Sequence, residues 1–167
     1  VLGGRRLVDV ALSAVAAARR IVLVGPGPAP EGVLLTREDP PFGGPVAGVA
    51  AGFAALEDHA AWTVLLACDL PEAEVGVGRL LAAEPGPEDD GVCLKDADGR
   101  LQWLLGCYRT EALTRRLSDR GDPPLTAMYR LLEPLHLLGI PADRTITDDI
   151  DTPADAARWT AHQEDHA

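Results

Sequence analysis

The amino-acid sequence predicts an α/β fold, a three-layer α/β/α sandwich with a mostly parallel sheet and a small antiparallel insertion. Short apolar runs without polar alternation, such as residues 21–24 and 63–68, are typical of strands buried on both faces of a parallel sheet. Segments with helical spacing of apolar residues lie between these runs, and turns rich in Gly and Pro separate them. Strands and helices that alternate in this way build a sheet covered by helices on both faces.

The alternation extends along the whole chain. In the first half, the sequence predicts a helix over residues 5–20, strands over 21–24 and 32–36, a helix over 46–56 and a strand over 63–68. In the second half, it predicts a helix over 72–83, strands over 91–94 and 101–108, helices over 110–117 and 125–132, a strand over 135–138, and a last helix from 153 to about 162. Residues 96–99, Asp-Ala-Asp-Gly, have the composition of a hairpin turn, so the strands on either side should pair antiparallel.

The composition favours a single acidic domain. With 167 residues, 47% of them hydrophobic, the chain is long enough for one substantial core, and we expect one domain over residues 1–167. The 15 basic and 26 acidic residues give a net charge of −11, which argues against a nucleic-acid or anionic-membrane surface. A single nucleotide bound through a divalent metal ion is compatible with this charge.

The cysteines and the apolar runs indicate a cytoplasmic protein. Cys68, Cys93 and Cys107 each lie inside an apolar run and form no C-x-x-C pair, as expected of buried free thiols in a reducing compartment. No apolar run approaches ~18 residues, and no signal peptide is visible. We therefore expect no membrane contact, and we expect a small acidic protein of this kind to work as a monomer. Since the chain opens at Val1 without a methionine, we also expect residues upstream.

Asp69 directly follows the strand over residues 63–68, and Leu70-Pro71 ends that strand. In open α/β sheets, ligands bind in the crevice outside the carboxyl ends of the strands, so an Asp69 carboxylate there is well placed to hold a metal ion. Aspartate is also common at such junctions because it caps loops and turns. The stretch by itself leaves both interpretations open.

A second acidic segment precedes the last helix. Thr152 and Asp155 are typical of a helix N-cap and its capping-box partner, with a proline at the first helical position. Asp149 and Asp151 have no part in that cap. If this segment is extended, both point to one side while Ile150 points to the core, and two such carboxylates repel each other unless a cation lies beside them. The pattern favours a functional role, although acidic residues also gain from the dipole of a nearby helix.

The loop over residues 43–48, Gly-Gly-Pro-Val-Ala-Gly, could approach a nucleotide closely. Its glycines allow close backbone contact, and the helix start that follows offers free N–H groups to a phosphate. Gly-Pro turns before helices are frequent, however, and the residues alone favour a plain loop.

Five blocks stand in a characteristic order: Arg37-Glu38-Asp39-Pro40, Gly43-Gly44-Pro45-Val46-Ala47-Gly48, Leu66-Ala67-Cys68-Asp69-Leu70-Pro71, Leu104-Leu105-Gly106-Cys107-Tyr108-Arg109 and Asp149-Ile150-Asp151-Thr152-Pro153-Ala154-Asp155. Their content and order resemble the MobA-like nucleotidyltransferases, and among these the chain is most similar to the molybdenum cofactor guanylyltransferases. The match covers nearly the whole chain, and the five blocks together are much more specific than any one alone.

The resemblance implies a nucleotide-diphospho-sugar transferase-like, Rossmann-like fold, a Mg²⁺ cofactor, and transfer of GMP from GTP to the phosphate of molybdopterin cofactor with release of pyrophosphate. Asp69 matches the family's metal-binding aspartate. Gly44 and Gly48 match its nucleotide-site glycines, and Asp39 matches the acidic position before them. The resemblance thus implies nucleotide contacts at these four residues.

The same resemblance assigns the second acidic segment to the metal. Asp149 and Asp151 match two positions that the family usually fills with asparagine before Thr-Pro. We therefore expect Asp69 and Asp151 to be catalytic and to bind the metal, with Asp149 as a supporting ligand. The change to aspartate raises metal affinity on physical grounds. Relatives that act with CTP, or on other phosphorylated acceptors, often resemble Asp-x-Asp-Thr-Pro here, which gives the alternative function.

The start of the chain departs further from the family pattern. The family's glycine-rich signature loop, whose arginine and lysine embrace the triphosphate, precedes a segment that residues 3–7 resemble, so we expect residues 1–167 to lack the N-terminal strand and this loop. A non-catalytic nucleotide-binding paralogue is therefore a further alternative. A receiver domain does not fit, because it needs an acidic pair in an earlier loop and a lysine after a later strand.

Overall fold

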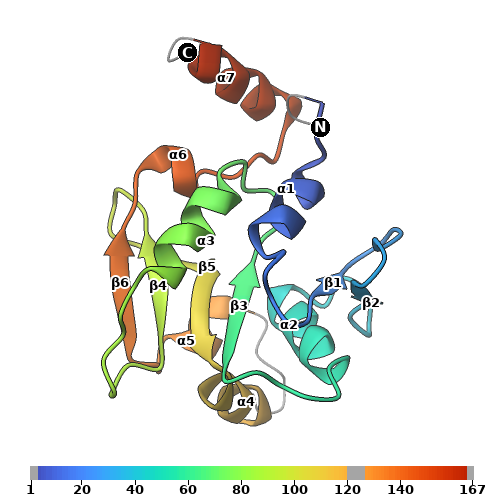
Figure 1. Ribbon diagram of the computed structural model, residues 1–167, viewed down its shortest axis with the longest axis vertical. Helices are drawn as coiled ribbons and strands as arrows, with labels where there is room; N and C mark the ends of the chain where they lie inside the picture. The colour runs from blue at the N-terminus through green and yellow to red at the C-terminus, as the bar shows by residue number, and fades with distance from the viewer. Residues whose placement is uncertain (1–3, 120–126, 165–167) are drawn as a thin grey trace.

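A computed structural model describes residues 4–119 and 127–164 of the protein. Within these residues, β1 pairs with β2, and four further strands form the main sheet in the order β3-β5-β4-β6 (Figure 1). The strands are β1 (Val22–Val24), β2 (Leu34–Thr36), β3 (Trp62–Leu66), β4 (Gly91–Lys95), β5 (Leu101–Arg109) and β6 (Leu137–Pro141).

In the main sheet, β5 runs against the other three strands. It pairs antiparallel with β3 and with β4, whereas β4 and β6 pair in parallel, so β3, β4 and β6 share one direction. β1 and β2 are also parallel. The expected hairpin joins β4 to β5, and there Asp96 Oδ1 accepts the N–H groups of Asp98 and Arg100, at 2.9 Å each. The α/β class predicted from the sequence, with its antiparallel insertion, is confirmed.

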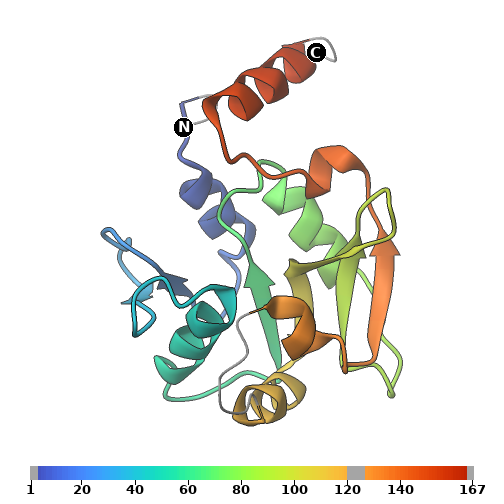
Figure 2. The ribbon, with the colours of Figure 1, turned by 180° about the vertical axis from the view of Figure 1, so that it is seen from behind.

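Helices cover both faces of the main sheet and give the molecule its three layers (Figures 1 and 2). They are α1 (Leu7–Ala14), α2 (Pro45–Ala54), α3 (Ala73–Leu81), α4 (Thr110–Ser118), α5 (Met128–Leu132), α6 (Arg144–Thr147) and α7 (Pro153–Glu164). Within the described residues, no helix is long and apolar enough to cross a membrane.

The core consists of two apolar clusters, one on each face of the main sheet. On one face, α1, α3 and α6 contribute Val10, Leu80 and Ile146. On the other face, α2, α4 and α5 pack through buried residues of their own, among them Leu113 and Leu131. Because successive side chains of a strand point to opposite faces, β5 serves both clusters, which explains why its sequence is apolar without alternation.

Several element boundaries differ from those expected, and the differences at α1 and β6 have a clear structural cause. α1 ends at Ala14 rather than at residue 20, because the helical pattern gives way to i→i−3 bonds from Ala16 to Ser13 and from Ala18 to Val15. The last strand, β6, covers 137–141 rather than 135–138, because Leu135 is buried in the helical cluster beside α5.

Three further differences concern single segments. The four-residue helix α6 was not expected from the sequence, and it begins just after β6. Residues 125–126, at the start of the helix expected over 125–132, lie outside the described residues. Cys68 is exposed rather than buried because it lies beyond the end of β3, whereas Cys93 and Cys107 are buried free thiols as expected.

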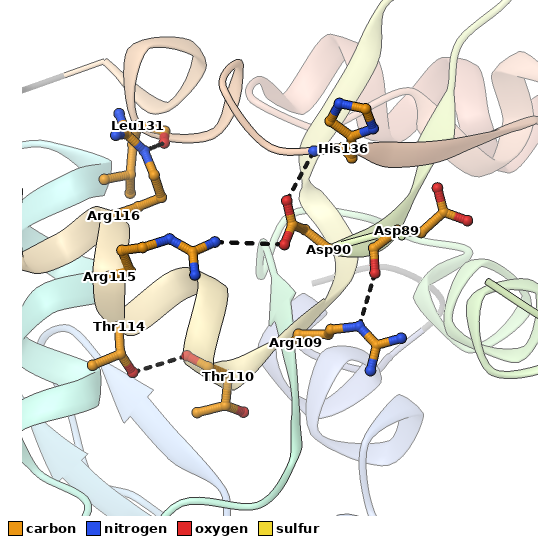
Figure 3. A network of polar contacts seen from close by, with 9 residues as sticks. All are labelled: Asp89, Asp90, Arg109, Thr110, Thr114, Arg115, Arg116, Leu131 and His136. Atoms are coloured by element: carbon orange, nitrogen blue, oxygen red, sulfur yellow. Dashed lines mark hydrogen bonds and ion pairs between the residues drawn. The ribbon is translucent and has the colours of Figure 1, made fainter. Parts of the chain in front are cut away.

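Polar contacts tie together the edge of the main sheet at which β4 and β6 begin (Figure 3). The N–H of Asp90 donates to the carbonyl oxygen of His136 at 2.7 Å, and the Asp90 carboxylate accepts the N–H of His136 at 3.0 Å. Arg109, at the end of β5, donates from Nε to the carbonyl oxygen of Asp89 at 2.8 Å. Arg115 of α4 reaches the Asp90 carboxylate at 3.6 Å. These contacts hold β4, β5 and β6 together at this edge. None of them involves the opposite edge, where β3, β4 and β6 end.

Two glycines are expected to respond oppositely to alanine. At Gly78 in α3, an added Cβ meets no atom within 4 Å, so Gly78→Ala should stabilise the fold by ~0.5–1 kcal/mol because the unfolded chain loses freedom. At Gly91 in β4, an added Cβ would lie 2.7 Å from the carbonyl oxygen of Cys107, so Gly91→Ala should destabilise by about 1–3 kcal/mol. Urea unfolding measures both changes. An unaltered stability of Gly91→Ala would mean that β4 and β5 lie further apart than in this structure.

Candidate active site

Asp69 lies just beyond the end of β3, at the edge where β3, β4 and β6 end. Buried Leu70 and Pro71 follow it and lead the chain into α3. The Asp69 side chain is half-buried, and its Oδ1 atom is buried without a hydrogen-bond partner among the described residues. An acceptor in that state costs about 1–3 kcal/mol unless a ligand satisfies it.

The segment after α6 brings two more carboxylates to Asp69. The N–H of Ile150 donates to the carbonyl oxygen of Asp69 at 3.0 Å, which holds the two segments together. Asp149 and Asp151 flank Ile150, and both are exposed, while Ile150 is half-buried. One carboxylate oxygen from each of Asp69, Asp149 and Asp151 lies within 4.8 Å of the others. We call these three residues the acidic cluster.

The cap expected at the start of the last helix is present, and its hydrogen bonds use no carboxylate of the acidic cluster. The Thr152 N–H donates to Asp155 Oδ2 at 2.8 Å, and the Asp155 N–H donates to Thr152 Oγ1 at 3.2 Å. This reciprocal pair is a capping box. Arg158 also pairs with the Asp155 carboxylate. Because Thr152 and Asp155 satisfy the helix start, Asp151 is not needed there.

Burial and like charge both act on Asp69. Burial raises the pKa of the Asp69 carboxyl group most, a backbone hydrogen bond opposes that change, and the carboxylates of Asp149 and Asp151 raise the pKa further. The carboxylates of Asp149 and Asp151 therefore make it harder for Asp69 to ionise. A divalent cation between them would reverse this effect, and carboxylate oxygens are the ligands that Mg²⁺ and Ca²⁺ prefer.

The glycine loop forms the start of α2. Gly44 is the N-cap of that helix, with φ 84° and ψ 178°, a backbone conformation that side chains rarely adopt. Gly48 lies one turn into the helix, and an added Cβ there would lie 3.7 Å from a methyl carbon of Val24. The first N–H groups of α2 therefore lie next to Gly44, which has no side chain that would block access to them.

Gly44 and Gly48 line a groove of about 660 Å³ together with residues of β1 and β3. Cys68, which precedes Asp69 in the sequence, also lines this groove, whereas Asp69, Asp149 and Asp151 do not. Asp39 is exposed, and it lies neither in the acidic cluster nor along the groove. Its neighbour Glu38 lines the groove instead.

The sequence analysis did not single out Glu38 and Phe42. Glu38 Oε1 accepts the N–H of Phe42 at 3.1 Å and so closes the loop before α2. Phe42 has φ 64°, and 96% of its surface is exposed. The sequence signal for Phe42 is its position between Pro-Pro and Gly-Gly. A loop of this composition provides no apolar core in which an aromatic side chain could be buried.

Comparison with models of known protein families identifies the family of this chain. The model of the MobA-like NTP transferase domain matches residues 1–137. The chain belongs to the MobA-like NTP transferase family. Membership supports a nucleotidyltransferase enzyme, with an NTP as one substrate and a phosphorylated molecule as acceptor. A search of the curated proteins found no match.

Solved structures share the fold of this MobA-like domain. One is 2-C-methyl-D-erythritol 4-phosphate cytidylyltransferase from Thermus thermophilus, with a TM-score of 0.73 and 14% identity over 98% of this chain and 92% of that chain. Another is molybdopterin-guanine dinucleotide biosynthesis protein A from Archaeoglobus fulgidus, with a TM-score of 0.64 and 18% identity over 99% of this chain and 89% of that chain. At these identities the likeness establishes the shared fold.

In metal-free buffer, Asp69→Asn should stabilise the protein at neutral pH. The folded protein holds the Asp69 proton to higher pH than the unfolded chain does, so wild-type stability falls as the pH rises above ~4 and through the raised pKa. We expect the variant to melt at a higher temperature than the wild type at pH 7, with a gain that shrinks toward pH ~4. Calorimetry with EDTA measures this. Glu133→Gln, which removes one negative charge at the end of α5, is the control. An equal gain in that variant would attribute the effect to net charge.

Proposed function

We propose that this protein is a Mg²⁺-dependent nucleotidyltransferase that transfers GMP from GTP to the phosphate of molybdopterin cofactor and releases pyrophosphate. The observation that carries the proposal is the acidic cluster, whose carboxylate oxygens lie within 4.8 Å of one another at the edge where the co-directional strands end. Family membership supports an NTP as one substrate and a phosphorylated molecule as the acceptor. The similarity to the molybdenum cofactor guanylyltransferases supports the choice of GTP and molybdopterin.

In this proposal, Asp69 and Asp151 bind the metal ion and Asp149 supports them. The donor set fits Mg²⁺, because it consists of carboxylate oxygens, one of which is buried without a partner. When bound, Mg²⁺ would neutralise negative charge on the triphosphate and polarise its α-phosphorus. An acceptor phosphate oxygen then forms a bond to the α-phosphorus. The bond from that phosphorus to the bridging oxygen breaks, and pyrophosphate leaves with the electron pair.

The nucleotide is proposed to bind along the glycine loop. Gly44 and Gly48 have no side chains, and the free N–H groups at the start of α2 suit phosphate oxygens. Asp39 is the acidic residue just before this loop, and we keep it in the nucleotide site on the family resemblance alone. Asp69 would contact the nucleotide through the metal.

A CTP-dependent transferase acting on another phosphorylated acceptor is the second candidate. Two observations favour it. The chain has aspartate at positions 149 and 151, where asparagine is usual in molybdenum cofactor guanylyltransferases. The fold also overlaps a cytidylyltransferase structure with a TM-score of 0.73. A non-catalytic nucleotide-binding paralogue is the third candidate.

Nucleotide choice can be tested by thermal shift with full-length protein. GTP with Mg²⁺, at 100 times its dissociation constant, should stabilise the native state by about 2.7 kcal/mol, because it binds only that state. CTP, ATP and UTP at the same concentration should shift the melting temperature less. A larger shift with CTP would replace the guanylyltransferase proposal with the second candidate. Equal shifts from all four nucleotides, or none, would contradict both.

The metal site can be tested with four variants of full-length enzyme, assayed for pyrophosphate release as Mg²⁺ is varied. Asp69→Asn should lower turnover by about 10²-fold or more, because it removes a ligand charge at the α-phosphorus. Asp151→Asn should retain much of the activity, because it keeps an oxygen ligand, whereas Asp151→Ala should not. Asp148→Asn is the matched control, since Asp148 is exposed and adjacent but outside the cluster. Normal Mg²⁺-dependent turnover of Asp69→Asn would exclude the proposed mechanism.

A further inference from the structure

β5 carries a bulge at the edge of the main sheet where β3, β4 and β6 end. Cys93 of β4 pairs with Gly106 of β5. Two residues further along β4, Lys95 pairs with Leu101, which lies five residues earlier in β5. β5 therefore holds three more residues than β4 over this stretch, and the two strands cannot pair residue for residue there. Bulges are frequent next to active sites, where they change the direction in which a side chain points.

Two buried side chains satisfy carbonyl groups within the bulge. The hydroxyl group of Tyr108 donates to the carbonyl oxygen of Trp103 at 2.8 Å, and the thiol of Cys93 donates to that of Gln102 at 3.1 Å. Both donor side chains are fully buried. An added Cβ at Gly106 would lie 2.5 Å from the Tyr108 hydroxyl oxygen, so this glycine makes room for the bond. The bulge is therefore a fixed part of the fold, with its carbonyl groups partnered.

The bulge turns Trp103 to the face of the sheet that α2, α4 and α5 cover. Leu105 and Cys107 belong to the core cluster on the opposite face, and strand alternation from them would send Trp103 to that face as well. Trp103 instead packs against the core cluster that includes Leu113 and Leu131. The side chain is half-buried, so part of the indole ring rests on this cluster and part remains in contact with solvent.

Trp103 lies close to Asp69. The carbonyl oxygen of Leu104, the next residue, accepts the N–H of Ala67 at 2.8 Å, and Ala67 lies two residues before Asp69. In both ribbon views, β5 is on one side of β3, and β1 and α2 are on the other side (Figures 1 and 2). Trp103 and the glycine loop therefore approach the end of β3 from opposite sides.

This arrangement suits a reaction between two substrates. In an in-line displacement, the attacking oxygen and the leaving oxygen lie on opposite sides of the phosphorus atom. In the proposed function, the nucleotide and its phosphates occupy the glycine loop at the start of α2. The acceptor then reaches the α-phosphorus from the β5 side, where the indole ring of Trp103 lies.

We propose that Trp103 is a specificity-determining residue, whose indole ring stacks on a flat heteroaromatic ring of the acceptor, such as a pterin. An aromatic ring that is packed on one side and open on another is a rigid platform for a second flat ring. A sugar or polyol phosphate has no flat ring and gains little from such a platform. The inference rests on the proposed function, because it assumes a phosphorylated acceptor, but it does not depend on the choice between GTP and CTP.

Isothermal titration calorimetry with full-length protein tests the inference. The protein is saturated with Mg²⁺ and with the α,β-methylene analogue of whichever NTP stabilises it most, so that no transfer can occur. The two probes are 6-hydroxymethylpterin monophosphate and glycerol 3-phosphate, which has a phosphate group but no ring. Wild-type protein should bind the pterin probe about 10-fold more tightly than glycerol 3-phosphate. Trp103→Leu, which keeps an apolar side chain on the core cluster, should lose this preference and bind glycerol 3-phosphate as before.

Two further variants serve as controls. Trp103→Phe keeps a smaller flat ring and should retain part of the preference. Trp62→Leu is the matched control and should retain all of it, because Trp62 is also partly exposed but lies at the start of β3, at the opposite edge. The guanidinium group of Arg109 already lies over the Trp62 ring, 4.7 Å from its centre. Unaltered affinity for the nucleotide analogue shows that each variant is folded.

Three results would overturn the inference. The first is equal affinity of wild-type protein for the two probes. The second is an unaltered preference in Trp103→Leu or, if that variant does not fold, in Trp103→Phe. The third is a folded Trp103→Leu protein that loses affinity for the nucleotide analogue rather than for the pterin probe, which would assign the ring to the nucleobase. The proposed function is tested separately by pyrophosphate release, so its failure is distinguishable from a failure of this inference.

Discussion

One backbone hydrogen bond holds the two halves of the acidic cluster together. The Ile150 N–H donates to the carbonyl oxygen of Asp69 at 3.0 Å, between segments far apart in the sequence. Because Asp149 and Asp151 flank Ile150, this bond brings both carboxylates beside that of Asp69. The arrangement is electrostatically unfavourable, and it raises the pKa of Asp69. A site that is costly without a cation and relieved by one is a reasonable basis for metal-dependent chemistry.

The network of polar contacts around Asp90 and the acidic cluster lie at opposite edges of the main sheet. At the edge where β4 and β6 begin, Asp90, His136, Arg109 and Arg115 satisfy one another and hold three strands and α4 in place (Figure 3). At the other edge, Asp69 keeps a buried oxygen without a partner among the described residues. The strands between the two edges are packed on both faces, so both edges belong to one close-packed core.

The acidic cluster and the groove are adjacent along the chain, at Asp69 and Cys68. The groove is lined by Gly44 and Gly48 of the glycine loop and by Cys68, which precedes Asp69.

The sequence by itself determined the α/β class, the hairpin after β4, the capping box at Thr152 and Asp155, and the acidic residues worth testing, because each depends on neighbours along the chain. Tertiary packing decided the rest. It shortened α1, moved the last strand to 137–141 and exposed Cys68, since burial and strand pairing depend on residues distant in sequence. It alone brought Asp69 within reach of Asp149 and Asp151. The local sequence pattern specifies which face of a strand or helix a side chain occupies. Only long-range contacts determine which residues it packs against.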